Sequence, residues 1–396
     1  MKRRYCIFAA QYFPHLGGVE RYTYNLAKKL IEAGDEVTVV TSNVQRIASY
    51  EKMEGITVYR MPCINLLDGR YPVLKFNGDF RKIHHILREK NFDFVIVNTR
   101  FYIHSLYGQW FAWSKKIPVI TIDHGSSHLS VNNKMWDAIG GVYEHIITKV
   151  GQLFCKDYYG VSKACVEWLW HFHIKAKGVL YNSVDLEEIE RLLTAGERTY
   201  RSRFQIPEDA TVITFTGRLL PEKGIPQLLD AMDILAKENP NLYLWIAGDG
   251  DLEELVNARQ NEHVIPLGRL PFEEIITMLS ESDIFCLPSF SEGFSTSILE
   301  AIACRCYVVT TKRGGAKETF PTDDYGMVIE DNETTRLTDA LRRSVSMGEA
   351  RDAAVELSYE RLKAHYTWDI VSAQVRQLCQ EKTTGKPSGR VRLCGD

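Results

Sequence analysis

The sequence predicts an α/β protein built from two Rossmann-like, doubly wound domains. Short β-branched and aromatic runs alternate with segments whose apolar residues recur at helical spacing. This alternation occurs twice, on either side of a polar, acidic stretch from Asp185 to about Pro207. The chain has 396 residues, more than one hydrophobic core usually supports. Alternating strands and helices are typical of parallel sheets that carry helices on both faces.

The expected strands follow from the apolar runs in chain order. In the first half they span residues 5–11, 36–41, 56–60, 93–98, 118–122 and 178–181. In the second half they span residues 211–216, 242–247, 263–267, 283–287, 307–310 and 326–329. The segment after the first strand predicts a helix, because its apolar residues fall at Val19, Tyr22, Leu26, Leu30 and Ile31.

The composition is that of a soluble globular protein, with 45% hydrophobic and 25% charged residues. The sequence has no apolar run of about 18 residues, the length that a membrane span needs. We interpret the short apolar run 5–10 as a first strand and not as a signal peptide. The nine cysteines show no metal-type spacing, and Cys6, Cys286 and Cys306 lie in strand-like runs as expected for buried free thiols. These features favour a reducing compartment, the cytoplasm.

The charge is unevenly distributed. Residues 1–185 hold 24 Lys and Arg against 16 Asp and Glu, whereas the remainder holds 24 against 35. This division suggests that the first half meets something anionic, although two ordinary solvated surfaces would give the same counts.

The most informative loop follows the expected strand 283–287. Glu292 lies in the loop, a helix is expected to begin near residues 295–297, and Glu300 lies about one turn inside that helix. The free amides of a first turn can bind a phosphate, and the two carboxylates can bind sugar hydroxyls and a ribose diol. Alternatively, Ser297 and Glu300 form a capping box that only secures the helix start. Taken alone, the segment leaves both interpretations open.

A pair of cations follows the expected strand 211–216. Arg218 and Lys223 lie between Gly217 and Gly224, so both can face a pyrophosphate. Cations placed there would stabilise the negative charge of a departing nucleoside diphosphate. The alternative is a solvated turn.

Two weaker candidates lie in the first half. Gly17 and Gly18 open the first helix, where a backbone without side chains can approach a ligand closely. His124 follows the expected strand 118–122, although a histidine in that place is more often structural than catalytic.

Together these segments resemble the retaining glycosyltransferases of family 4, which have the two-domain GT-B fold. The spacing Glu-x7-Glu appears as Glu292 to Glu300, and the phosphate pair as Arg218 and Lys223. Further segments in the family's order are 181–185, 248–251 and 314–318, so the resemblance covers nearly the whole chain. Asn182-Ser183 stands where the family often has Asn-Gly, a departure that bears on the freedom of the hinge.

The resemblance implies roles for the site residues. Glu292 would hold the donor sugar with backbone at Gly293, Phe294 and Ser295, the amides of Thr296 and Ser297 would meet the pyrophosphate, and Glu300 would bind the ribose. Arg218 and Lys223 would bind the diphosphate, which Gly17 and Gly18 would reach from the other domain across the cleft. His124 would face the reacting sugar, and Arg269 and Leu270 would lie near the base.

The resemblance also implies the domain organisation. We expect an acceptor-binding domain at 1–184, a nucleotide-sugar-binding domain at 185–365, a helix at 366–381 that returns to the first domain, and a flexible tail at 382–396.

No metal or other cofactor is predicted. Asp249 and Asp251 resemble the Asp-x-Asp metal site of other glycosyltransferases, but they follow the strand 242–247 and open a helix, where Asp is an ordinary N-terminal cap. Similar enzymes neutralise the leaving group with protein cations.

The predicted function is retaining transfer of a hexose-type sugar from a UDP- or GDP-sugar to an acceptor hydroxyl, in cell-surface polysaccharide or glycolipid synthesis. Basic residues near Trp110, Trp113, Trp168 and Trp170 suggest a lipid-linked glycan acceptor and peripheral contact with anionic lipid at the inner face of the plasma membrane. Those aromatic residues can equally belong to the core.

Two rival functions remain on the sequence alone: a nucleotide-sugar 2-epimerase of similar architecture, and a non-catalytic nucleotide-sugar-binding protein. Nucleic-acid binding is not predicted, because no recognition motif accompanies the basic residues.

Overall fold

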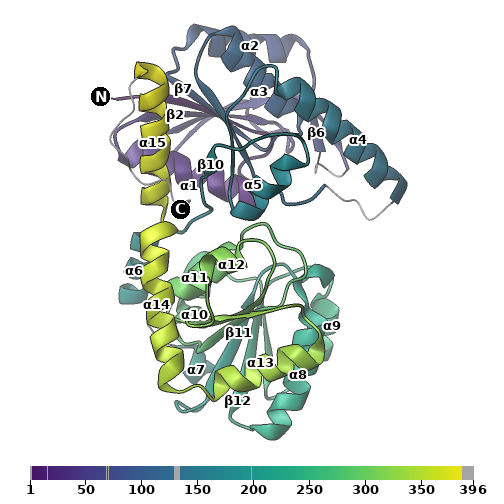
Figure 1. Cartoon of the computed structure of the whole chain (residues 1–396), viewed down its shortest axis with the longest axis vertical. Coiled ribbons are helices and arrows are strands. Elements are labelled where there is room, and N and C mark those ends of the chain that lie inside the picture. The colour runs from purple at the N-terminus through teal and green to yellow at the C-terminus, as the bar shows by residue number, and fades with distance from the viewer. Residues whose placement is uncertain are drawn as a thin grey trace. The chain divides into compact units, whose positions relative to one another are not determined.

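The computed structural model describes residues 2–15, 17–67, 69, 71–128, 134–197 and 199–385. The chain divides into two units: unit 1 is Met1–Tyr181 with Trp368–Asp396, and unit 2 is Asn182–Thr367. Each unit contains a sheet of mostly or wholly parallel strands with helices packed on it (Figure 1). The prediction of two Rossmann-like α/β domains is confirmed.

The main sheet of unit 1 has the strand order β10-β9-β8-β7-β1-β2-β4-β3. All neighbours pair in parallel except β3 and β4, which are antiparallel. Its strands are β1 (Arg4–Ala9), β2 (Glu36–Ser42), β3 (Tyr50–Met53), β4 (Ile56–Met61), β7 (Phe94–Asn98), β8 (Val119–Asp123), β9 (Tyr158–Gly160) and β10 (Gly178–Val179). A separate hairpin joins β5 (Cys63–Leu66) to β6 (Tyr71–Leu74). The strands β3, β5, β6 and β9 were not predicted from the sequence.

The helices of unit 1 are α1 (Gly18–Glu32), α2 (Gly78–Glu89), α3 (Ile103–Ser114), α4 (Lys134–Gly151), α5 (Lys163–Trp170) and α15 (Trp368–Thr384). Alternate residues of the central strand β1, Cys6 and Phe8, pack into one apolar cluster with Phe111 of α3. Tyr5 and Ile7, which alternate with them along the strand, are also fully buried, so both faces of the strand are covered. Burial on both faces explains why the strand is apolar throughout and does not alternate with polar residues.

Helix α15 joins unit 1 although it comes last in the chain. The ring of Trp368 contacts the ring of Tyr22 on α1 at a centroid distance of 4.9 Å. Lys382 pairs with Asp157 at 2.5 Å. The helix ends at Thr384, so the predicted tail at 382–396 begins inside it, and residues 386–396 lie outside the described residues.

Unit 2 contains a fully parallel sheet in the order β13-β12-β11-β14-β15-β16. Its strands are β11 (Thr211–Thr216), β12 (Leu242–Ala247), β13 (Val264–Gly268), β14 (Ile284–Leu287), β15 (Tyr307–Thr311) and β16 (Met327–Ile329). Its helices are α6 (Leu186–Ala195), α7 (Tyr200–Arg203), the 3₁₀ turn η1 (Pro221–Lys223), α8 (Ile225–Glu238), α9 (Glu253–Ala258), α10 (Phe272–Ser280), α11 (Thr296–Ala303), α12 (Ala316–Thr319), α13 (Thr334–Val345) and α14 (Glu349–His365).

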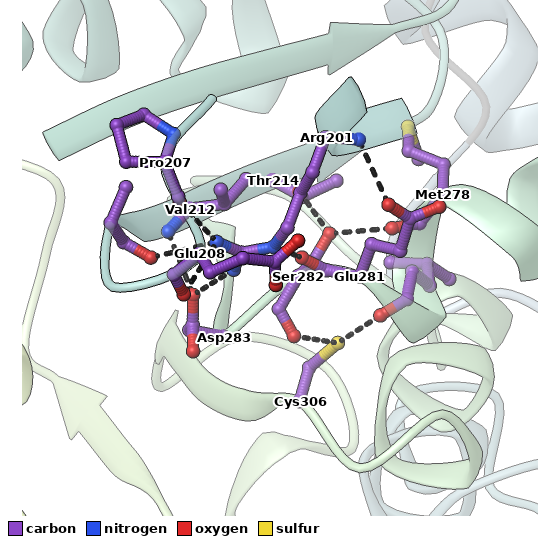
Figure 2. Close-up of polar contacts among 12 residues, drawn as sticks. Arg201, Pro207, Glu208, Val212, Thr214, Met278, Glu281, Ser282, Asp283 and Cys306 are labelled. Carbon is purple, nitrogen blue, oxygen red and sulfur yellow. Dashed lines mark hydrogen bonds and ion pairs between the residues drawn. The ribbon is translucent and has the colours of Figure 1, made fainter. Parts of the chain in front are cut away.

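A polar cluster fastens the amino ends of β11 and β14 (Figure 2). Arg201 pairs with Asp283 at 2.9 Å, and the same carboxylate oxygen accepts the amide of Val212 at 2.8 Å. Glu281 accepts the amide of Arg201 at 2.8 Å and so secures the start of α7. Because these contacts occupy the amino edge of the sheet, they lie opposite the carboxyl edge, where ligands bind in open α/β sheets.

The cysteines of the described part of the chain are free thiols, and all but Cys63 are buried. This confirms the expectation for Cys6, Cys286 and Cys306. Within the same described residues, no helix is long and apolar enough to cross a membrane.

Candidate functional site

The carboxyl edge of the unit 2 sheet brings most of the predicted donor residues together. Because its strands are all parallel, the loops that follow β11, β12, β13 and β14 leave from the same edge. Those loops carry Arg218 and Lys223, Asp249, Arg269 and Glu292 respectively.

Close packing of two loops positions Lys223. It ends the turn η1, and Gly224 follows in the left-handed conformation with φ of 72°. A Cβ atom at Gly224 would lie 2.2 Å from the carbonyl oxygen of Pro288, so only glycine allows this approach. The amide of Phe290 also donates to the carbonyl of Glu222 at 2.9 Å. These contacts hold the loop after β11 against the loop after β14.

Lys223 and Glu292 form an ion pair. Lys223 Nζ donates to Glu292 Oε1 at 2.6 Å, and the hydroxyl of the buried Ser289 donates to the same oxygen at 2.7 Å. The side chains of Lys223 and Glu292 are 19% and 13% exposed, so the pair is largely shielded but reachable from solvent. A predicted phosphate cation and a predicted sugar-binding carboxylate, 69 positions apart in the sequence, are therefore direct neighbours.

Helix α11 begins at Thr296 with Ser295 as its N-cap. Ser297 therefore lies inside the first turn, and the alternative of a capping box between Ser297 and Glu300 is wrong. The Ser295 side chain makes no capping hydrogen bond and instead lies 2.9 Å from the hydroxyl of Ser297. The amides of Thr296 and Ser297 thus lie in the first turn, where helix amides can bind an anion. Glu300 is buried within the helix, with 7% of its surface exposed.

A small pocket adjoins this loop and is lined in part by Glu292, Ser295, Arg313 and Gly315. Asn182 fastens the same loop from the start of unit 2, because its side-chain amide donates to the carbonyl of Phe294 at 3.2 Å. Ser289 and Arg313 had no predicted role, and Asn182 was predicted to matter only for the freedom of the hinge. The sequence signal for Ser289 was limited to its place three positions before Glu292.

Arg218 is exposed at the carboxyl edge, and backbone contacts with the next loop support its position. The amide of Leu219 donates to the carbonyl of Asp249 at 2.7 Å. Gly248 allows the two loops to meet, because a Cβ atom there would lie 1.8 Å from the carbonyl oxygen of Gly217. The structure gives Arg218 an open position beside these loops.

Asp249 and Asp251 do not cap the helix that follows them. The N-cap of α9 is Leu252, without a side-chain capping bond, so that prediction was wrong. Asp249 instead lies 3.5 Å from Arg269 Nη1, and both side chains are at least half exposed. Leu270, the other residue predicted near the base, follows β13 and is partly exposed.

In unit 1 the predicted glycines begin α1, with Gly17 as N-cap and Gly18 as the first helical residue. The buried Glu20 lies over this helix start, and its carboxylate would be 2.4 Å from a Cβ atom at Gly17. His15 Nδ1 lies 3.3 Å from the same side chain. An anion that approached these amides would therefore face the Glu20 carboxylate, a feature that the sequence analysis missed.

His124 follows β8 and is held as a neutral ring. Its Nε2 lies 3.1 Å from Asn98 Oδ1, an acceptor, so we assign the proton to Nε2. The Asn98 amide in turn donates to Thr23 at 2.7 Å, and the ring of Tyr22 packs edge-on against His124 at 4.8 Å. These surroundings desolvate the ring and lower the pKa of His124 to about 3. His124 can accept or donate a hydrogen bond at neutral pH but cannot supply a positive charge.

A buried ionic network includes Asp123, the residue that precedes His124. Arg100 is 1% exposed and binds Asp123 at 2.9 Å and Glu144 at 2.9 Å. Burial raises the pKa of Asp123, and the nearby Arg100 guanidinium opposes that shift. The network joins the ends of β7 and β8 to α4.

Both halves of the chain match glycosyltransferase families. The family described as Glycosyl transferases group 1 matches residues 196–361, and the family described as Glycosyltransferase Family 4 matches residues 16–188. Together the two matches cover most of the chain.

Individual proteins are similar over nearly the full length. An uncharacterized glycosyltransferase of Methanocaldococcus jannaschii is 25% identical over 93% of this chain and 95% of its own. The phosphatidylinositol N-acetylglucosaminyltransferase GPI3 subunit of Saccharomyces cerevisiae is 24% identical over 93% of this chain and 80% of its own. HepE of Anabaena, solved in complex with UDP-glucose, has a TM-score of 0.71 at 17% identity, covering 96% of this chain and 100% of its own.

Proposed function

The chain belongs to the group 1 glycosyltransferases of family 4, and on that basis we propose that it transfers a hexose-type sugar from a nucleotide diphosphate sugar to an acceptor hydroxyl. The observation that carries the proposal is the pairing of Lys223 with Glu292 beside the first turn of α11. This arrangement combines a cation, helix amides and a carboxylate at the ligand-binding edge of a parallel sheet.

The donor would be a uridine or guanosine diphosphate sugar. Lys223, Arg218 and the amides of Thr296 and Ser297 would bind its diphosphate, and Glu292 would bind hydroxyls of its sugar. Arg269 and Leu270 would lie near the base, and Glu300 near the ribose. The UDP-glucose complex of HepE, a protein of the same fold, supports a nucleotide sugar as the ligand.

The reaction would retain the anomeric configuration. As the bond from the anomeric carbon to the phosphate oxygen breaks, the acceptor oxygen would form its bond on the same face and pass its proton to the leaving phosphate. Lys223 and Arg218 would stabilise the charge that develops on that phosphate, without a metal ion. His124 would contribute a neutral hydrogen-bonding group, and Gly17 and Gly18 would contribute backbone amides once the Glu20 carboxylate has turned away.

A thermal-shift comparison of UDP-, GDP- and ADP-sugars tests the donor assignment. A ligand that binds only the folded protein at about 100 times its Kd adds about 2.7 kcal/mol of stability. We expect a UDP- or GDP-sugar to raise the melting temperature, and the variant Lys223→Ala to lose most of that shift. The exposed Lys237 on α8 provides the matched control, Lys237→Ala, which should keep the shift.

Two results would contradict the proposal. One is the absence of a shift with any nucleotide sugar. The other is epimerised free nucleotide sugar formed without acceptor, which indicates the epimerase reaction and not transfer.

We further propose a lipid-linked acceptor and peripheral contact with an anionic membrane. Helix α4 exposes an apolar stripe at helical spacing, namely Met135, Ile139, Val142 and Ile146, each at least 52% exposed. Trp113 and Trp170 are also exposed, at 56% and 60%. A helix that shows apolar residues to solvent is suited to lie in a membrane interface. The phosphatidylinositol-directed GPI3 subunit among the similar proteins supports a lipid acceptor.

The structure also limits which residues of unit 1 can support contact with a membrane. Several basic residues of the first half are engaged within unit 1: Arg4 pairs with Asp93, and the buried Lys29 pairs with Asp369. Trp168 stacks on His171 at 4.6 Å. The proposal therefore depends on the α4 stripe more than on those residues.

Flotation with anionic vesicles tests the proposed membrane contact through α4. We expect the protein to float at low salt and Ile139→Glu with Val142→Glu to abolish flotation, because charge on the stripe opposes burial in lipid. Ile234→Glu, at a residue 41% exposed in unit 2, serves as the control and should float as the unchanged protein does. Equal flotation of both variants would overturn the assignment of α4.

A further inference from the structure

Three histidines of unit 1, none of which is a proposed donor residue, converge at one point. His128 lies in the loop after β8, His145 on α4, and His171 directly after α5. The Nε2 atom of His171 lies 3.2 Å from that of His128 and 3.1 Å from that of His145. All three ligand atoms lie within 4.8 Å of one another.

These separations approach those of a metal site. Zn²⁺ binds histidine nitrogen at about 2.0–2.1 Å in a tetrahedral arrangement, which places neighbouring nitrogens about 3.3 Å apart. Two of the three nitrogen pairs are within about 0.2 Å of that value. The third pair, His128 and His145, lies within 4.8 Å and would close by rotation of the exposed His145 side chain. His145 and His171 are exposed, so an ion can reach them from solvent.

The positions of the protons on the ring nitrogens also favour a bound cation. Glu144 Oε2 lies 3.1 Å from His128 Nδ1, and since a carboxylate accepts, Nδ1 of His128 carries a proton. In the neutral ring, the Nε2 atom of His128 then presents a lone pair to the other two rings. His171 Nε2 faces both other Nε2 atoms, and one ring nitrogen carries either one proton or one lone pair, so without an ion the two contacts cannot both be ordinary hydrogen bonds. One cation satisfies all three nitrogen atoms.

The surroundings provide the support that metal-binding histidines usually have. A carboxylate that binds the second ring nitrogen orients the ligand and raises its basicity. Glu144 does this for His128 and is itself held by the buried Arg100 at 2.9 Å. Trp168 stacks on the ring of His171 at 4.6 Å, and the buried Phe172 contacts the three rings at centroid distances of 5.7, 4.7 and 5.0 Å.

We propose that unit 1 binds one Zn²⁺ ion through the Nε2 atoms of His128, His145 and His171. Three protein ligands leave a fourth position for water or another oxygen ligand. The ion would link the loop after β8 to α4 and α5. Its three ligands belong to unit 1, and none of them is among the residues proposed to neutralise the leaving group.

Cobalt substitution tests the site without any assay of transfer. Co²⁺ in a four-coordinate site gives visible absorption bands, which Zn²⁺ abolishes by displacement. We expect the untagged full-length protein to bind one Co²⁺ per chain with these bands. His145→Ala and His171→Ala should each weaken binding by about 100-fold or more, since second-shell changes alone cost up to that amount.

The controls separate loss of a ligand from loss of the fold. Both altered side chains are exposed, so the variants should keep the far-ultraviolet circular dichroism of the unchanged protein. His85→Ala removes an exposed histidine of α2 outside the cluster and should bind as the unchanged protein does. Absence of four-coordinate Co²⁺ bands in the unchanged protein, or unaltered metal affinity in His145→Ala and His171→Ala, would overturn the proposal.

Discussion

Replacing Arg100 by Met destabilises unit 1 by about 3–5 kcal/mol at neutral pH, the typical result of removing one partner from a buried ion pair. Asp123 and Glu144, which are almost fully buried, lose their shared cation in this variant. Met has a similar length and is apolar, so the cavity contributes little. The loss arises from carboxylates left without a partner.

The loss depends on pH in a defined direction. Burial already raises the pKa of Asp123, and Arg100 opposes that effect. Without Arg100, the folded-state pKa rises further above the unfolded value of about 3.9. The folded state then binds a proton that the unfolded chain releases, so stability falls as pH rises from about 4 through the folded pKa. The destabilisation is therefore larger at pH 8 than at pH 5.

Measuring the denaturation of unit 1 at pH 5, 6.5 and 8 checks this expected dependence of the destabilisation on pH. The surface offers a matched control, because Arg259 also binds two carboxylates, Asp230 at 3.0 Å and Asp233 at 2.5 Å, but is 31% exposed. Arg259→Met should cost no more than about 1 kcal/mol at any pH, as exposed pairs do. Similar losses in the two variants, or an Arg100→Met loss that does not change with pH, would show that burial is not the cause.

Lys223→Ala lowers kcat by about 100-fold, and Arg218→Ala lowers it by at least tenfold, while Lys237→Ala leaves it unchanged. Removing one group that stabilises developing negative charge costs about 10²–10³ in kcat. The larger loss is expected for Lys223, because it is partly shielded from water and held in place by Glu292. Initial rates of transfer at saturating donor measure the effect.

A second variant distinguishes catalysis from local structure. If Lys223 served only to neutralise Glu292, then Lys223→Ala would have little further effect in the background of Glu292→Gln. The double-mutant cycle isolates that pairwise contribution. Near-normal rates in both Arg218→Ala and Lys223→Ala would overturn the assignment of the pair to the diphosphate.

Much of the fold could be predicted because the central strands are buried on both faces. Residues 5–9 of β1 are fully buried, so the strand appears in the sequence as an apolar run. The strands that were missed either lack this property or are too short to show it. The edge strand β3 has no buried residue, β5 is mostly exposed, and β9 has three residues, too few for any periodicity.

The candidate site was predictable in composition but not in geometry. The loops that carry Lys223 and Glu292 could be placed at one edge, because parallel strands end together. The ion pair between these two residues could not be predicted, because it depends on the close approach of Gly224 to Pro288. The histidine cluster draws on a loop, a helix and a helix end, 17 and 26 residues apart, so no spacing in the sequence indicates it. The boundary of α9 was wrong because Leu252, and not an aspartate, is its N-cap.

The position of α15 has a consequence for synthesis of the chain. Unit 2 is continuous in sequence, and its two ends meet where the amide of Val184 donates to the carbonyl of Tyr366 at 3.1 Å. Unit 1 is assembled from an early and a late segment. On the ribosome, unit 2 can therefore finish folding first. The contact between Tyr22 on α1 and Trp368 forms only after Trp368 has emerged. The domain that is begun first is the last to be completed, and premature termination near residue 367 would leave its α1 surface uncovered.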